Sequence, residues 1–106
     1  MEYNTIVVYI TVPSWEVGKQ IANNLVECSL AACVNIIPGI TSIYHWQGAV
    51  QQDSELLLIA KTRAELFDSL ASTVKKIHPY DVPEVIAIPI IAGSNEYLAW
   101  IREETD

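Results

Sequence analysis

Four titratable side chains gather around two prolines in residues 78–84, which read His-Pro-Tyr-Asp-Val-Pro-Glu. His78 lies at the expected end of a helix, where the helix dipole favours a bound proton, and Asp81 and Glu84 follow closely. A histidine in this setting can bind a metal ion, carry a proton or hydrogen-bond a ligand, but it can equally cap the helix or bond across a subunit interface. Tyr80, Asp81 and Glu84 would complete a polar pocket, unless Asp81 only holds the local turn.

Three residues outside this segment could line the same pocket. Lys61 closes a run of apolar residues, so it either meets an anion in a cleft or extends its ammonium group from a strand end into water. Tyr44 and Trp46 share one strand face, where aromatic rings can stack on a ligand or anchor an interface between subunits. Glu84 begins an apolar strand, and a pairing with Lys61 or Arg63 is an expected contact.

The spacing of the cysteines and histidines gives little support to a metal site built from them. Cys28 and Cys33 are five residues apart, which matches neither redox nor zinc-ribbon patterns. Two cysteines without a secretory signal are more often buried thiols than a disulfide, and Cys33 is expected to begin a buried strand. Both thiols together with His45 and His78 would suit Cu(I) or zinc, but His45 is expected at the surface.

Charge and composition limit the classes of partner. Six Lys and Arg stand against 13 Asp and Glu, a net charge of −7, so the chain lacks the basic surface that nucleic acid or an anionic membrane requires. The longest uninterrupted apolar run, residues 85–92, is too short to span a bilayer, and the first residues do not resemble a signal peptide, so we expect a cytoplasmic protein. No serine lies in a nucleophile-elbow context, and the four glycines are too scattered for a phosphate-binding loop.

Hydrophobic periodicity and turn residues predict the order of helices and strands. The expected elements are a strand over 3–12, a helix capped by Ser14 and ending near 28–30, an extended segment over 31–46 broken at 38–39, a strand from Val50 or Ser54 to Lys61, a helix ending before Pro79, a strand over 85–91 and a short helix after 94. Thr62 and Glu65 form an expected capping box, and Pro89 places the last strand at a sheet edge. This order predicts a single α+β domain over 1–106, a ferredoxin-like βαββαβ sandwich with an extra C-terminal helix.

Several of the expected strands are apolar on both faces. Val7 and Tyr9 alternate with the apolar residues of the other face, and Leu57 and Ile59 do the same in the third strand. Two helices can cover only one face of a four-stranded sheet. Each such side chain left in water forgoes about 1.5–3 kcal/mol, so five or more together forgo about 10 kcal/mol, comparable to the net stability of a domain. We therefore expect a closed homo-oligomer in which sheet packs against sheet.

Five segments, taken together, resemble the CutA family of divalent-cation tolerance proteins. They are residues 31–39, 41–48, 59–62, 78–84 and 97–100, and the resemblance covers nearly the whole chain. It implies a very stable homotrimer of ferredoxin-like subunits, related in architecture to the PII signalling proteins, and a role in tolerance of copper and other divalent metals. The copper site reported in the family corresponds to Ile10, Ile77 and His78 here. Only His78 among these three could coordinate a metal ion.

The function that these observations favour is a trimeric binding protein with a regulatory or stress-response role. Its clefts between subunits would hold a metal ion, copper or another divalent ion, or a small molecule. The expected lining residues are Cys33, Tyr44, Trp46, Lys61, His78, Tyr80 and Glu84. Two alternatives stay open: an enzyme of unknown reaction that uses His78 as acid or base, and a scaffold without ligand whose segment 78–84 only locks the trimer.

Overall fold

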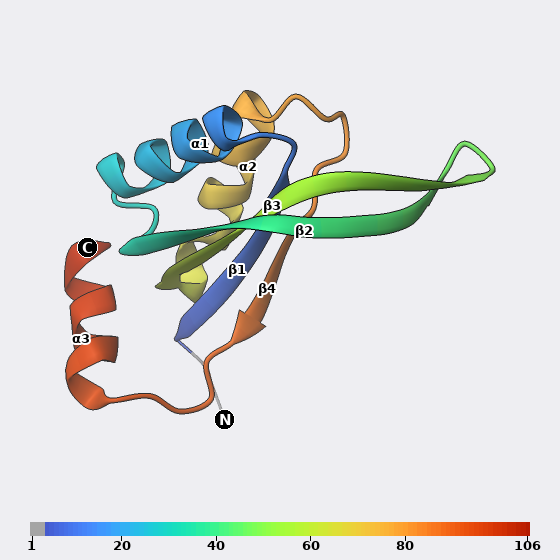
Figure 1. The fold of residues 1–106 in the computed structure, drawn as a ribbon. Helices are drawn as coiled ribbons and strands as arrows, with labels where there is room; N and C mark the ends of the chain where they lie inside the picture. The colour runs from blue at the N-terminus through green and yellow to red at the C-terminus, as the bar shows by residue number, and fades with distance from the viewer. Residues whose placement is uncertain (1–3) are drawn as a thin grey trace.

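The structure, a computed structural model, describes residues 4–106 and contains four strands and three helices (Figure 1). They are β1 (Thr5–Val12), α1 (Trp15–Glu27), β2 (Cys33–Trp46), β3 (Ala49–Arg63), a 3-10 turn (Ala64–Leu66), α2 (Phe67–Ile77), β4 (Val85–Pro89) and α3 (Asn95–Glu104). Tyr3, expected in the first strand, lies outside the described residues. None of the helices in 4–106 is long and apolar enough to cross a bilayer.

The sheet has the strand order β2-β3-β1-β4, and every neighbouring pair is antiparallel. Strand β3 lies between β1 and β2, which is the split βαβ arrangement. The predicted ferredoxin-like α+β fold is thereby confirmed. Strand β4 lies at an edge, as Pro89 indicated, but it ends at Pro89 rather than at residue 91.

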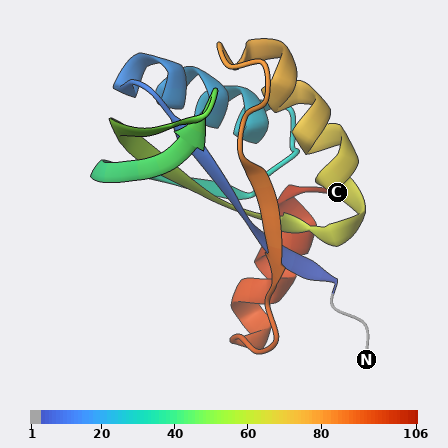
Figure 2. The same ribbon diagram turned by 90° about the vertical axis from the view of Figure 1, so that its right-hand side faces the viewer.

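Helices α1 and α2 cover one face of the sheet (Figure 1, Figure 2). Successive side chains of a strand point to opposite faces, so every second residue of β1, from Ile6 to Val12, points toward the helices. The core contains Ile6, Val8, Ile10, Val12, Leu58 and Ala60 from the sheet, packed with Ile21, Leu25, Leu70 and Val74 from the helices and with Ala31 from the segment before β2. Gly18 lets α1 approach closely, because a Cβ there would lie 3.1 Å from Val12 Cγ2.

The two main helices begin in different ways. Ser14 caps α1 as predicted, accepting a hydrogen bond from the Val17 N–H at 3.2 Å. The predicted capping box of Thr62 and Glu65 is wrong, because Thr62 pairs with Ile6 inside the sheet and its side chain is buried. Glu65 instead binds Arg63, and a 3-10 turn without a side-chain cap leads into α2.

The opposite face of the sheet is partly covered by α3, whose position the sequence did not predict. Helix α3 packs against β3 and β1, and Ile101 is fully buried. Arg63 holds the end of this helix, since its Nε donates to Thr105 Oγ1 at 3.0 Å and its Nη2 to the Thr105 carbonyl at 2.6 Å. Tyr97, expected to point inward, is 43% exposed.

The rest of that face stays open in the single chain. Tyr9 and Ile59 are half-buried, so they are neither free in water nor sealed by the chain itself. On the edge strand β4, Ile86 and Ile88 are 51% and 45% exposed. The open apolar surface expected from the sequence is therefore present, and it is largest toward β4.

Strands β2 and β3 continue beyond the helices as a two-stranded arm (Figure 1). The arm consists of residues 40–46 of β2, residues 49–55 of β3 and the turn between them. The register shifts between Ile37 and Ile40, so the break predicted at residues 38–39 is a β-bulge, with Gly39 at φ 80°. Gln47 and Gly48 form the turn at φ 51° and 77°. Strand β3 begins at Ala49, earlier than expected, because the polar residues before Leu56 are paired along the arm.

We expect Leu58→Ala to lower the free energy of unfolding by about 2–5 kcal/mol, because the lost side chain leaves a cavity in the core. Leu58 is fully buried, whereas Val26 on α1 is 44% exposed and provides a control. Val26→Ala should change this free energy by less than about 0.5 kcal/mol. Urea unfolding at one fixed protein concentration measures both changes. Equal effects of the two substitutions would contradict this account of the core.

Candidate functional site

A cavity of about 680 Å³ lies where the arm faces the loop that leads into β4. The arm contributes Ser42, Ile43, Tyr44, Trp46 and Glu55, β1 contributes Thr11, and the loop contributes Pro79, Tyr80, Asp81, Val82 and Glu84. Four residues predicted from the sequence therefore meet here: Tyr44, Trp46, Tyr80 and Glu84. The cavity combines aromatic walls with carboxylates.

Glu55 is the buried charged group of this cavity. Its exposed fraction is only 7%, and its Oε2 accepts a hydrogen bond from the Tyr80 hydroxyl at 3.0 Å. Burial and the bond to Glu55 raise the pKa of Tyr80 to about 12. Closer to the turn of the arm, the Tyr44 hydroxyl donates to Asp53, and this bond raises the pKa of Tyr44. Both phenols are therefore protonated donors at neutral pH.

His78 is buried and holds Tyr80 in place. Its Nε2 lies 2.7 Å from the Thr11 carbonyl oxygen, which can only accept, so Nε2 carries the hydrogen. Its Nδ1 accepts the Tyr80 backbone N–H at 3.1 Å, and the two rings lie 4.6 Å apart. The β1–β4 ladder ends at Ile10 and Val85, so His78 binds the first β1 carbonyl beyond that ladder. Both ring nitrogens are thus occupied by the backbone.

The residues that the family resemblance implies for copper do not fit a copper ion. Ile10 is a fully buried core residue, Ile77 is half-buried, and neither has a ligand atom. The two nitrogens of His78 are already hydrogen-bonded. Across residues 4–106, no three His, Cys, Asp or Glu side chains are grouped so that they could hold a metal ion.

Cys33 and Lys61 lie elsewhere on the same sheet face. They are direct cross-strand partners, with Lys61 Nζ 4.0 Å from Cys33 Sγ, and Lys61 also donates to Asn35. Lys61 lies six positions after Glu55 in β3, which corresponds to about 20 Å along the strand. One chain therefore does not bring this pair to the cavity, and their place in a cleft shared between copies stays a prediction.

The expected pairing of Glu84 with Lys61 or Arg63 is wrong. Lys61 binds Asn35, and Arg63 binds Glu65 and the end of α3. Glu84 lies instead in the wall of the cavity. The contact was expected because Glu84 begins an apolar strand, whereas the strand register places both cations toward the other end of the sheet.

Sequence reasoning missed Glu55 and Asp53, although the sequence contains a signal for Glu55. Glu55 stands two residues before Leu57 and four before Ile59 in one strand, so strand periodicity places all three on the same face. A carboxylate on a face that is otherwise apolar needs a partner. The structure identifies that partner as Tyr80, which approaches from a loop 25 residues away.

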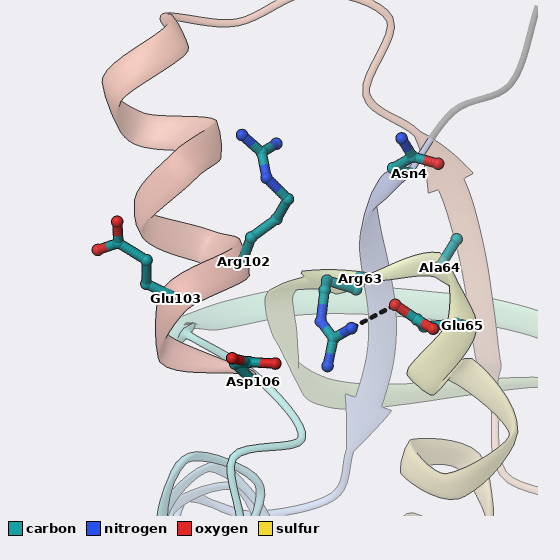
Figure 3. A pocket seen from close by; sticks show the side chains of 7 residues that line it. All are labelled: Asn4, Arg63, Ala64, Glu65, Arg102, Glu103 and Asp106. Carbon is teal, nitrogen blue, oxygen red and sulfur yellow. Dashed lines mark hydrogen bonds and ion pairs between the residues drawn. The ribbon is translucent and has the colours of Figure 1, made fainter.

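A second cavity, of about 590 Å³, lies between α3 and the start of β1 (Figure 3). Arg102 extends into it from α3, and the paired Arg63 and Glu65 form another wall (Figure 3). Glu103 and Asp106 also line it. Arg63 is already bound to Glu65 and to the end of α3, so this wall of the cavity is occupied by contacts that attach α3 to the sheet.

We expect the Tyr80 hydroxyl to titrate near pH 12, well above the ordinary tyrosine value of 10.0. The difference in tyrosinate absorbance between wild type and Tyr80→Phe isolates this group. Glu55→Gln should move its midpoint back toward 10, because the amide removes the negative charge. Since folding raises this pKa, the stability that the phenol contributes is complete below about pH 10 and is lost as the pH rises through about 12. A midpoint near 10 in the wild type would contradict the Glu55 bond.

The comparisons with known proteins agree on one family. A family model described as "CutA1 divalent ion tolerance protein" matches residues 6–104. The divalent-cation tolerance protein CutA of Thermus thermophilus is 60% identical over 99 residues, which cover 93% of this chain and 96% of that protein. The chloroplastic protein CutA of Arabidopsis thaliana is 57% identical over 95% of this chain, and the chain spans 56% of its length.

The fold comparison gives the same answer. A solved structure of the Thermus thermophilus divalent cation tolerance protein superimposes with a TM-score of 0.94 at 58% identity, covering 96% of this chain and 99% of that one. The family resemblance that rested on five sequence segments is confirmed by a match over residues 6–104. The chain belongs to the CutA1 family of divalent ion tolerance proteins.

Proposed function

We propose that this protein acts in divalent-cation tolerance as a homotrimeric binding protein, whose cleft beside Glu55 and Tyr80 takes up a small ligand. The observation that carries the proposal is a buried carboxylate that opens into a cavity, one wall of which is an arm with exposed apolar side chains. Relatives named for divalent-cation tolerance support the general role.

The arm supports assembly from several copies. Ile43 and Val50 are each 66% exposed and Trp46 is 52% exposed, far more than expected for apolar residues in the body of a stable sheet. A two-stranded ribbon has little stability by itself, so its exposed side chains favour a covering partner. Ile43 and Trp46 also line the cavity. A neighbouring subunit that covers the arm would therefore also enclose a ligand bound in the cavity.

Within one chain, the charge of the cavity favours a cationic ligand. Glu55, Asp81 and Glu84 line it, and no basic side chain of residues 4–106 does. An uncompensated buried carboxylate attracts a positive charge. The whole chain carries −7, which adds a long-range attraction for cations.

We propose a regulatory or stress-response role rather than catalysis. The histidine expected to act as acid or base, His78, has both ring nitrogens hydrogen-bonded within the chain, which disfavours that role. The protein is proposed to work in the cytoplasm, where free thiols such as those of Cys28 and Cys33 are kept reduced.

Native mass spectrometry of the protein as purified from cells tests the proposal. We expect a species of three chain masses that carries a bound small ligand or ion. Ile43→Asp should shift the distribution toward smaller species, because a carboxylate would then lie in the covered arm. Val26→Asp on α1 is the matched control and should leave the trimer intact. A wild-type protein that sediments as a monomer at every concentration would refute the assembly, and with it the shared cleft.

A further inference from the structure

We propose that the cavity recognises an organic ammonium cation rather than a bare divalent metal ion, with Glu55 as counter-ion and with Tyr44, Trp46 and Tyr80 as aromatic walls. The inference rests on the proposed function, since it names the class of ligand for the same cavity. Nothing in the names of the relatives assigns such a ligand.

Glu55 supplies the negative charge that such a cation needs. Its side chain is more than nine-tenths buried, and Tyr80 bonds only to Oε2. Within residues 4–106, Oε1 forms no hydrogen bond, so this oxygen remains available to a ligand. One neutral phenol does not compensate a buried carboxylate, and a cation in the cavity would. Asp81 and Glu84 add negative charge at the wall.

The aromatic side chains match the same class of ligand. A positive charge over the face of a tryptophan or tyrosine ring is attracted by the ring electrons, most strongly where water is excluded. Three such side chains, Tyr44, Trp46 and Tyr80, line one cavity together with a carboxylate. Because the pKa of Tyr80 is about 12, its ring stays uncharged at neutral pH. Ile43 and Val82 provide apolar surface for the alkyl groups of an organic cation.

The size of the cavity and its ligand atoms argue against a bare ion. At about 680 Å³ the cavity lies in the usual range for small-molecule sites, about 300–1,000 Å³. A divalent ion requires several ligand atoms at about 2.0–2.6 Å, and residues 4–106 contain no three metal-binding side chains so grouped. Glu55, Asp81 and Glu84 all line the cavity without forming such a group.

Calorimetric titration of the wild-type protein with choline tests the inference. The control ligand is the uncharged isostere of choline, in which a tert-butyl group replaces the trimethylammonium. We expect choline to bind about tenfold or more tightly than this isostere, because only the cation gains the carboxylate and ring interactions. Equal binding of the two would overturn the proposal.

Variants locate the binding. Glu55→Gln and Trp46→Leu should each weaken choline binding by about tenfold or more, and circular dichroism should show that both still fold. Glu27→Gln and Trp15→Leu, both exposed on α1 and outside the cavity, are the matched controls and should bind as the wild type does. Undiminished binding in Glu55→Gln would overturn the assignment of the counter-ion.

A parallel titration with Zn²⁺ and Cu²⁺ separates this inference from the proposed function. One outcome is a trimer that does not bind choline but does bind a metal ion, with the metal binding lost in Glu55→Gln. This outcome would overturn the proposed ligand class and leave the proposed function standing. A monomer that binds neither choline nor metal would overturn both. Choline binding without tight metal binding supports the ammonium site.

Discussion

The antiparallel pairing of β1 with both β3 and β4 determines which side chains lie on each face of the sheet. Ile6, Val8 and Ile10 point toward α1 and α2 only in this register, and Glu55 lies on the opposite face for the same reason. A slip by one residue would exchange the two faces and remove the core from the helices. The cavity depends on this pairing too, since the Thr11 carbonyl that binds His78 lies just past the last β1–β4 pair.

Local patterns in the sequence predicted the local structure well. Alternation in 5–12 and the helical spacing after Ser14 gave the first strand and helix, and Pro38 with Gly39 marked the bulge. The errors arose where a distant segment decides the conformation. Thr62 and Glu65 have the spacing of a cap, but pairing with β1 keeps Thr62 extended. The position of α3 depends on Arg63, forty-two residues from Thr105.

The candidate site was predicted in part for the same reason. Tyr44, Trp46, Tyr80 and Glu84 meet in one cavity, because the arm and the loop before β4 face each other. Glu55 was missed, since its importance lies in a bond to Tyr80 across the fold. His78 was singled out as the likeliest functional histidine, and in the structure it links the end of α2 to β1 and fixes the backbone of Tyr80. The polar chain Thr11–His78–Tyr80–Glu55 therefore joins three separate segments around the cavity.

The arm is the part of the chain where local unfolding is expected to begin. In a single chain, its outer strand pairs, near Gln47 and Gly48, receive no support from α1 or α2, and only backbone hydrogen bonds and each other's side chains hold them. Local opening costs least where so little is packed, so in a chain separated from its partners the amide hydrogens there exchange first and exchange spreads inward toward the bulge. Fraying of this ribbon would separate Tyr44 from Asp53 before it disturbs the core. The wall of the cavity would thus loosen while the domain behind it stays folded.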